Sequence, residues 1–406
     1  MANEEASALE VDESRAAERS PPVEPSPGAA ALFFSFLRAG ATAFGGPAMV
    51  PYIGELATRR KRWLSKEEFA EGVALCQSIP GATAMQTAAF VGLRAAGVRG
   101  AAAAYVGFGL PAVVLMVAAS AAYGHAVSLA PVQATFRGFR AMIVALVANA
   151  ALRFARANFR SISDVLVAAA CALALYAKAS PVVVIAAAIL LEVVLRRHAP
   201  STSSAGTSRS WPPGIRRTVL ALLAAALAIL VLLLVFAPRL GTLAAICLKV
   251  DMLAFGGGFA SVPLMFREMV GRSWLDARAF MDGIALGQVT PGPIVVTATF
   301  VGYQIAGLSG AVVATIGIFF PSFVMVVAAA PWFGALRARS WYGPALHGAL
   351  LSFVGLLVFV TFQFATALSW SVGMAALATA ALVALLAGVD VLWIVVASGS
   401  VAALLL

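Results

Sequence analysis

Runs of apolar residues separated by short polar loops follow one another along almost the whole chain. Each run is close to the ~20 residues that an α-helix needs to cross a bilayer. Nine of these runs are uninterrupted, and they span 100–123, 134–152, 162–177, 181–195, 218–237, 309–330, 345–364, 370–388 and 389–406. This pattern predicts an all-α polytopic membrane protein.

Four further apolar runs are interrupted in their middle by Gly-Gly or Pro-Gly, where helix propensity is poorest. They span 30–51, 69–93, 241–263 and 280–303. We expect broken helices here, and a broken helix can leave the membrane by the face at which it entered. The chain therefore predicts about 10–13 membrane segments, some of them broken or re-entrant.

Two pairs of motifs show that the sequence contains an internal repeat. The segment AFGGPAMVP (43–51) recurs as AFGGGFASVP (254–263), and ALCQSIPG (74–81) recurs as ALGQVTPG (285–292). Matched positions are 211 residues apart in this region and 210 residues apart further downstream. We predict that the protein consists of two homologous halves.

The amino-acid composition excludes several classes of protein. Apolar residues make up 62% of the chain and charged residues only 11%, whereas a soluble domain has about 25% charged residues. A soluble enzyme, a fibrous protein and a mostly disordered chain are therefore excluded. The net charge of +10 is typical of basic cytoplasmic loops, and no interleaving of basic and aromatic residues indicates nucleic-acid binding.

The polar segments divide the chain into predicted units. Residues 1–28 hold seven acids, two bases and the stretch PPVEPSPG, which is typical of a disordered acidic tail. We predict the first repeat at 29–197 and a Ser/Pro/Gly linker at 198–217. The remainder, 218–406, holds an extra transmembrane helix (218–237) and then the second repeat.

The distribution of Lys and Arg reverses between the two copies. Loop 52–68 holds five of these residues and its counterpart 264–279 holds three. Three arginines follow the run 134–152 but none occupies 365–370, whereas 332–344 has two and 124–133 has none. Because Lys and Arg gather in cytoplasmic loops, we predict an inverted repeat with 52–68 inside and 264–279 outside. Inverted repeats with interrupted helices are typical of secondary transporters, whose sites lie near the membrane midplane.

The helix breaks are candidate substrate-binding elements. A broken helix exposes backbone N–H groups, which carry partial positive charge and attract anions. The alternative is that these small residues serve close helix packing. The candidate residues at the breaks are Gly45, Gly46, Pro80, Gly81, Gly256, Gly257, Pro291 and Gly292.

Two cations occupy equivalent places in the repeat. Arg38 lies six residues before Phe44, and Lys249 lies six residues before Phe255. Symmetry would bring both to the midplane, where they could bind a dianion; the alternative is that they reach out to the membrane interface. Asp251 is a candidate partner for Lys249.

Further polar residues add to the candidate site. Arg140 is a candidate substrate-binding residue in the first half only, because the uncharged Leu350 stands at its matched position. Arg137 is matched by His347. Glu71 and Asp282 match each other and are candidates for proton coupling, or simply favourable charges near a helix N-terminus. The neutral hydrogen-bond donors are Gln77, Gln288 and Thr290.

Several motifs are missing from the sequence. No nucleotide-binding loop, HExxH, GxSxG or Cys/His set is present. Cys76, Cys171 and Cys247 lie in apolar segments and are expected to be small buried hydrophobes. An ATP-driven pump and a metalloenzyme are disfavoured, and we expect no metal and no cofactor.

The duplicated motifs resemble those of the chromate ion transporters. AFGGP (43–47), RKRWLS (60–65) and EFAEGVALCQSIPG (68–81) are similar to that family's N-terminal half. AFGGGFASVPL (254–264) and DGIALGQVTPGPI (282–294) are similar to its C-terminal half. The resemblance implies a long-chain transporter of the bacterial inner membrane that exports chromate with the proton-motive force and confers chromate resistance.

Other functions fit parts of the same pattern. Sulfate has the same shape and charge as chromate, so a sulfate or other oxyanion permease or exchanger is an alternative. An intramembrane enzyme is a weaker alternative, since no site for a redox cofactor is visible. The expected partners are a chromate- or sulfate-like oxyanion, protons, the lipid bilayer and, as a homodimer, a second copy of the chain.

Overall fold

The computed structural model of the protein describes residues 27–42, 49–196 and 214–405. The predicted acidic tail and linker therefore lie almost wholly outside the described residues, as do Gly45 and Gly46. Every regular element in the described residues is helical, which confirms the all-α prediction.

The helices of the two halves follow the same order. The first half contains α2 (Ala29–Thr42), α3 (Met49–Gly54), the π-helical turn η2 (Glu55–Arg60), α4 (Lys66–Ser78), α5 (Thr83–Ala126), α6 (Ala130–Asn158), α7 (Ile162–Tyr176) and α8 (Pro181–Leu195). The second contains α10 (Pro238–Leu253), α11 (Gly258–Gly271), α12 (Ala277–Val289), η3 (Ile294–Val296), α13 (Thr297–Ala329), η4 (Ala330–Trp332), α14 (Phe333–Arg337), α15 (Tyr342–Thr366), α16 (Val372–Leu386) and α17 (Val391–Leu405). Between them lies α9 (Ile215–Phe236), the extra helix that the sequence predicts.

The nine uninterrupted apolar runs all form helices in the structure. In the described part of the chain, five helical segments are long and apolar enough to cross a membrane. One of them is α9, whose most apolar stretch has no residue buried by the rest of the protein. Such a surface is suited to contact with lipid, as expected of a multi-pass membrane protein.

The backbone repeats at the predicted spacing. The bounds of α7 and α16 differ by the same 210 residues that separate α8 from α17. Long helices α5 and α13 are both bent at matched Ala-Gly pairs, with φ/ψ of −147°/28° at Ala96 and −147°/29° at Ala306. The following residues, Gly97 and Gly307, have φ of 65° and 61°, a left-handed conformation that glycine adopts without steric cost. Both halves therefore contain the same helical hairpin.

Breaks at Pro80-Gly81, Gly256-Gly257 and Pro291-Gly292 interrupt the helices as predicted. Helices α4 and α12 each have 13 residues. At about 1.5 Å per residue each is ~20 Å long, which is shorter than the ~30 Å hydrocarbon core. Neither helix can cross a membrane alone, so these segments are broken elements rather than simple spans.

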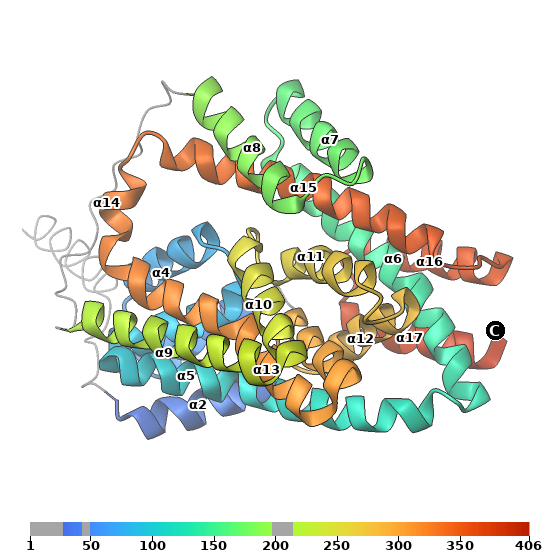
Figure 1. Ribbon diagram of the computed structural model, residues 1–406, viewed down its shortest axis with the longest axis horizontal. Helices are drawn as coiled ribbons and strands as arrows, with labels where there is room; N and C mark the ends of the chain where they lie inside the picture. The colour runs from blue at the N-terminus through green and yellow to red at the C-terminus, as the bar shows by residue number, and fades with distance from the viewer. Residues whose placement is uncertain (1–26, 43–48, 197–213, 406) are drawn as a thin grey trace, which may run out of the picture.

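Each half contributes a pair of helices that packs against a helix of the other half. Helices α7 and α8 pack against α15 of the other half, and α16 and α17 pack against α6. Gly348 lets α15 approach the backbone of Ala188, and at the matched position Gly138 lets α6 approach that of Ser398. Here the glycines serve close packing. Figure 1 shows α14 at one end of the molecule and the turn that joins α5 to α6 at the other, as expected for an inverted repeat.

Candidate functional site

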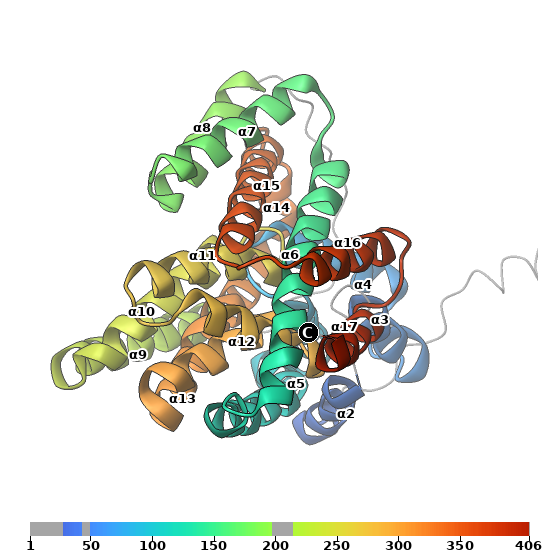
Figure 2. The ribbon, with the colours of Figure 1, turned by 90° about the vertical axis from the view of Figure 1, so that its right-hand side faces the viewer.

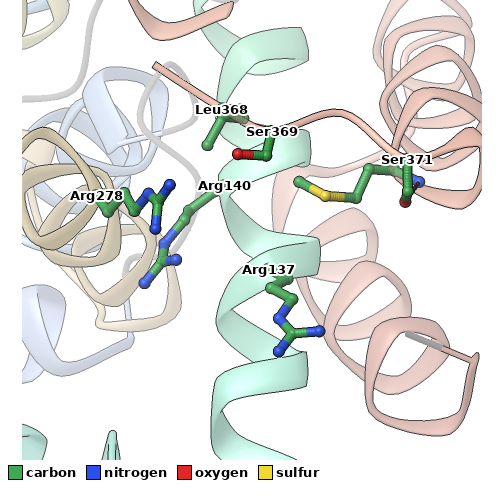
Figure 3. A pocket seen from close by; sticks show the side chains of 7 residues that line it. Arg137, Arg140, Arg278, Leu368, Ser369 and Ser371 are labelled. Carbon is green, nitrogen blue, oxygen red and sulfur yellow. Dashed lines mark hydrogen bonds between the residues drawn. The ribbon is translucent and has the colours of Figure 1, made fainter.

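A pocket with a volume of about 440 Å³ lies between α6, α12 and the start of α16. Arg137 and Arg140 project from the first turns of α6, and Arg278 projects from the start of α12 (Figure 3). We call it the arginine pocket, and its other lining residues are Leu368, Ser369, Ser371 and Met374. Three guanidinium groups around one pocket favour an anionic ligand, because their planar N–H donors match the oxygens of a carboxylate, phosphate or similar group.

Arg140 is held in place by a buried carboxylate. Its Nε and Nη2 donate to Oδ1 and Oδ2 of Asp282, each at 2.7 Å. The hydroxyl of Tyr123 donates to Oδ2 of Asp282, also at 2.7 Å. Asp282 is fully buried, so the bidentate pair fixes the orientation of the guanidinium and leaves its other N–H donors for a ligand.

Three of the side chains that line the arginine pocket are basic. Asp282 neutralises Arg140, and Asp276 caps α12 by accepting a hydrogen bond from the backbone N–H of Arg278 at 3.0 Å. The N-terminus of α16 adds a partial positive charge, with Ser371 as its N-cap residue.

The matched carboxylate in the first half has a different partner. Glu71 on α4 forms an ion pair with Arg94 at 3.5 Å, while Asp282 on α12 pairs with Arg140. The two arginines are not related by the repeat, because Gln304 and Leu350 stand at their matched positions. Both carboxylates are neutralised, and their role in proton coupling stays a prediction.

Arg38 and Lys249 are not brought together. Their helices α2 and α10 lie at opposite ends of the row α2–α5–α13–α10 (Figures 1 and 2). Lys249 forms an ion pair with Glu268 of α11, while Arg38 is exposed and has no ion pair among the described residues. Their part in substrate binding stays a prediction.

Asp251 does not pair with Lys249, and this expectation is wrong. It is fully buried and accepts hydrogen bonds from the backbone N–H and the hydroxyl of Ser322 on α13. Residues two apart on a helix point to different faces. Lys249 therefore faces α11, while Asp251 faces the centre of the protein.

The helix breaks of the two halves contact each other. The backbone N–H of Gly81 donates to the carbonyl of Ala254 at 3.0 Å. A Cβ atom on Gly81 would lie 1.9 Å from Oγ of Ser322, so the close approach requires glycine. The candidate donors lie around these breaks: Gln77 is exposed, Gln288 is half-buried, and the hydroxyl of Thr290 donates to the carbonyl of Gly287.

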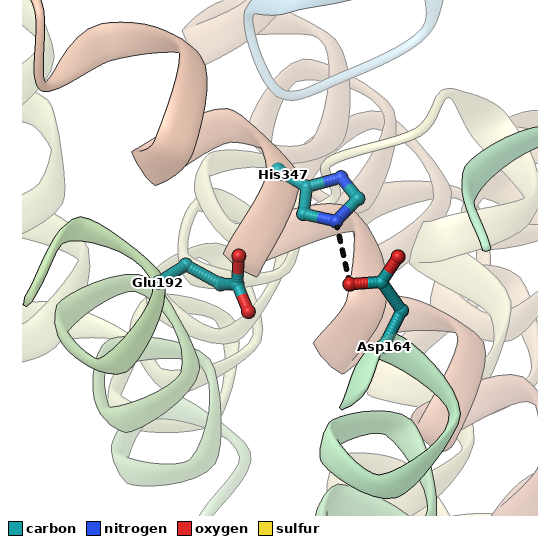
Figure 4. A group of neighbouring side chains, drawn as sticks. All are labelled: Asp164, Glu192 and His347. Carbon is teal, nitrogen blue, oxygen red and sulfur yellow. Dashed lines mark hydrogen bonds and ion pairs between the residues drawn. The ribbon is translucent and has the colours of Figure 1, made fainter. Parts of the chain in front are cut away.

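A second polar cluster joins the two halves near the start of α15. Asp164 and Glu192 are buried, and His347 Nε2 lies 3.2 Å from Oδ1 of Asp164 (Figure 4). Arg196 pairs with Asp164 at 2.5 Å and with Glu192 at 2.6 Å. We call these four residues the His347 cluster. The carboxylate and imidazole groups are metal-ligand types, but here a guanidinium lies between the carboxylates.

Sequence reasoning missed several of these residues. It did not single out Tyr123, Arg278, Asp164, Glu192 or Ser322. The match of Arg137 to His347 was the signal in the sequence that pointed to these residues, because it relates the arginine pocket to the His347 cluster. The three cysteines are free and buried, as expected.

Comparisons with known proteins match most of the chain. The sequence model of a family described as "Chromate transporter" matches residues 30–193 and again 241–403. An uncharacterised transporter of Methanocaldococcus jannaschii is 40% identical over 349 residues, which cover 86% of this chain and 87% of the relative.

Two relatives are named as chromate transport proteins. The one from Pseudomonas aeruginosa is 29% identical over 82% of this chain and 80% of its own length. The one from Cupriavidus metallidurans is 29% identical over 74% of each chain. No solved structure matches this chain.

Proposed function

The chain belongs to the chromate transporter family, and from this premise we propose that it is a secondary transporter that exports chromate from the cytoplasm. Two relatives that align with most of the chain are named as chromate transport proteins. The observation that carries the proposal is the arginine pocket, an open cationic space of about 440 Å³.

The arginine pocket is suited to a tetrahedral dianion. Asp282 holds Arg140 in place and leaves N–H donors of its guanidinium available, and Arg137 and Arg278 line the same pocket. Guanidinium groups that are fixed in place bind oxyanions without losing much side-chain entropy. Chromate and sulfate share charge and shape, so these contacts alone favour neither of them.

The loop charges support an orientation of the protein in the membrane. On the predicted orientation, loops 124–133 and 264–279 lie outside, and the arginine pocket lies beside both of them. We place the outer release site there. Outward movement of a dianion is favoured by an inside-negative potential, at about 2.3 kcal/mol per charge per 100 mV. Exchange for inward-moving protons adds the proton gradient as a further driving force, and export would confer chromate resistance.

Uptake of radiolabelled chromate into inside-out vesicles tests this proposal. We expect energy-dependent uptake by the wild type. In right-side-out vesicles, where labelled chromate enters from the outer face by exchange, we expect a KM for chromate at least about tenfold higher in the double variant Arg137→Gln/Arg278→Gln, since each charged hydrogen bond is worth about 1.5–3 kcal/mol. Arg217→Gln, on the exposed surface of α9, is the matched control and should behave as wild type.

Two results would contradict the proposal in different ways. An unchanged KM in the double variant would remove the arginine pocket from the transport pathway. Absence of chromate transport by folded wild-type protein would remove chromate as the substrate. Faster flux of labelled sulfate than of chromate under the same potential would favour the alternative, an oxyanion permease or exchanger.

A further inference from the structure

Asp251 is a buried carboxylate at the place where the helix breaks of both halves meet. It lies in the last turn of α10, just before the Gly256-Gly257 break, and is fully buried. The backbone N–H of Ser322 donates to its Oδ2 at 2.7 Å, and the Ser322 hydroxyl lies 2.9 and 2.7 Å from its two carboxylate oxygens. Among the described residues, no cationic side chain forms an ion pair with Asp251.

The surroundings of Asp251 oppose a negative charge. The titratable groups that face it are Tyr105 on α5 and Cys247 on α10, and neither supplies a positive charge. Ser322 is its neighbour on α13, and the Pro80-Gly81 break brings only backbone groups. The carbonyl groups at the end of α10 add partial negative charge. Burying a carboxylate without a partner is costly, whereas the neutral acid costs much less.

The hydrogen-bond geometry accommodates a proton on this group. The Ser322 hydroxyl has one hydrogen, so it cannot donate to both oxygens of Asp251 at once. With a proton on Oδ1, Asp251 would donate to Oγ of Ser322, while Oδ2 would keep the bond from the backbone N–H. Oγ of Ser322 also accepts from the backbone N–H of Ala82 in the other half, at 3.3 Å.

The other candidate carboxylates, unlike Asp251, form ion pairs with arginine. Glu71 and Asp282 are each paired with an arginine, so protonation of either would break an ion pair. The repeat places Gly40 opposite Asp251 and Ala112 opposite Ser322. Gly40 lies so close to the carbonyl of Phe108 that a Cβ atom would clash. The described part of the chain therefore has one such site rather than two.

We propose that Asp251 is the proton-binding residue that couples transport to the proton gradient, with Ser322 as its hydrogen-bond partner. This inference rests on the proposed proton-driven export. In the state described here Asp251 holds the proton. When the contacts Gly81–Ala254 and Ala82–Ser322 separate and water enters, the O–H bond breaks, the proton passes to water, and the carboxylate remains until a proton returns from the other side.

Purified protein in liposomes, without a membrane potential, tests this assignment. We expect an imposed pH gradient to drive chromate accumulation by the wild type, and Asp251→Asn to reduce that accumulation at least tenfold. Exchange of labelled for unlabelled chromate needs no net proton movement, so it should stay within about threefold of wild type in the same variant. Asp390→Asn, in the exposed loop between α16 and α17, is the matched control.

The outcomes separate the two proposals. A wild type that exchanges chromate but ignores the pH gradient would overturn proton coupling itself. A responsive wild type together with an equally responsive Asp251→Asn variant would overturn only the assignment of Asp251. Accumulation driven by a sodium gradient instead, and lost in Asp251→Asn, would overturn the proton in favour of a metal cation.

A second variant tests the proposal even if Asp251→Asn does not fold. Ser322→Ala introduces the residue that the first half has at the matched position, Ala112, and should fold. It removes a hydrogen bond that favours the charged carboxylate. We expect the pH midpoint of proton-driven flux to rise by roughly one unit, with the KM for chromate unchanged. An unchanged midpoint would contradict the role of Ser322 and Asp251.

Discussion

The arginine pocket and the His347 cluster occupy matched places in the two halves. One lies between the first turns of α6 and the N-terminus of α16, and the other lies between the first turns of α15 and the N-terminus of α7. Arg137 corresponds to His347, and Met374 corresponds to Asp164. The same backbone framework thus surrounds an open pocket lined by arginines in one place, and in the other an ion-pair network of two acids, a histidine and an arginine.

The comparison shows that the two halves have kept the same helix framework while the charged groups within it have diverged. Helix order, kinks and close glycine contacts are matched between the halves, because they are needed to pack the helices. The ion-pair partners of the charged groups are not matched: Glu71 pairs with Arg94, whereas Asp282 pairs with Arg140. In an inverted repeat the arginine pocket and the His347 cluster face opposite sides of the membrane. A transporter can therefore bind its substrate at one of them and use the other to stabilise the contact between its halves.

The largest expected effect comes from removing the buried ion pair behind the arginine pocket. Arg140→Leu introduces the residue of the matched position and leaves Asp282 buried with only Tyr123 as a side-chain partner. We expect the free energy of unfolding to fall by about 3–5 kcal/mol, measured by denaturant unfolding in detergent. The double variant Arg140→Leu/Asp282→Asn should recover much of the loss; equal instability in both would show that the pair does not carry the effect.

A smaller loss of stability is expected at the His347 cluster. Arg196→Gln leaves Asp164 and Glu192 side by side without their guanidinium. Because about a third of the Arg196 side chain is exposed and solvent screens it, we expect a loss of about 1–2 kcal/mol at neutral pH. The loss should shrink as the pH falls, since protonation removes the repulsion between the carboxylates. A thermal unfolding series over pH measures this, and a loss independent of pH would contradict it.

The smallest effect tests the comparison directly. Met374→Asp introduces the acid of the His347 cluster into the arginine pocket, and the new carboxylate should compete with the anion for the arginines. We expect chromate affinity to fall about tenfold, or about 1.4 kcal/mol, relative to a variant that loses the same buried methionine without gaining a charge. Met374→Asn is the matched control without the charge. Equal affinities of the two variants would show that the pocket does not select by charge.

The sequence predicts the helices well and the contacts between them poorly. Apolar runs and the 210-residue offset identify the helices, because membrane burial and helix breaking act locally along the chain. The partners of charged residues depend on which helices meet. Asp282 is matched to Glu71 by the repeat, but its partner Arg140 is on a helix with no matched arginine.

Asp251 shows the same limit at short range. Its neighbour in the sequence, Lys249, was the expected partner, yet the helix turns the two side chains in different directions. Ser322 became the partner because α10 packs against α13. That contact follows from the tertiary structure, and no pattern within either segment contains it.

The exchange of helix pairs between the halves has a consequence for how the protein is made. Helices α16 and α17 cover α6, which is synthesised more than two hundred residues before them. During translation the surface of α6 that contacts α16 and α17 stays uncovered by them until these helices have been synthesised. Completion of the first half therefore depends on the arrival of α16 and α17, and a truncation before α16 would leave both halves incomplete rather than one.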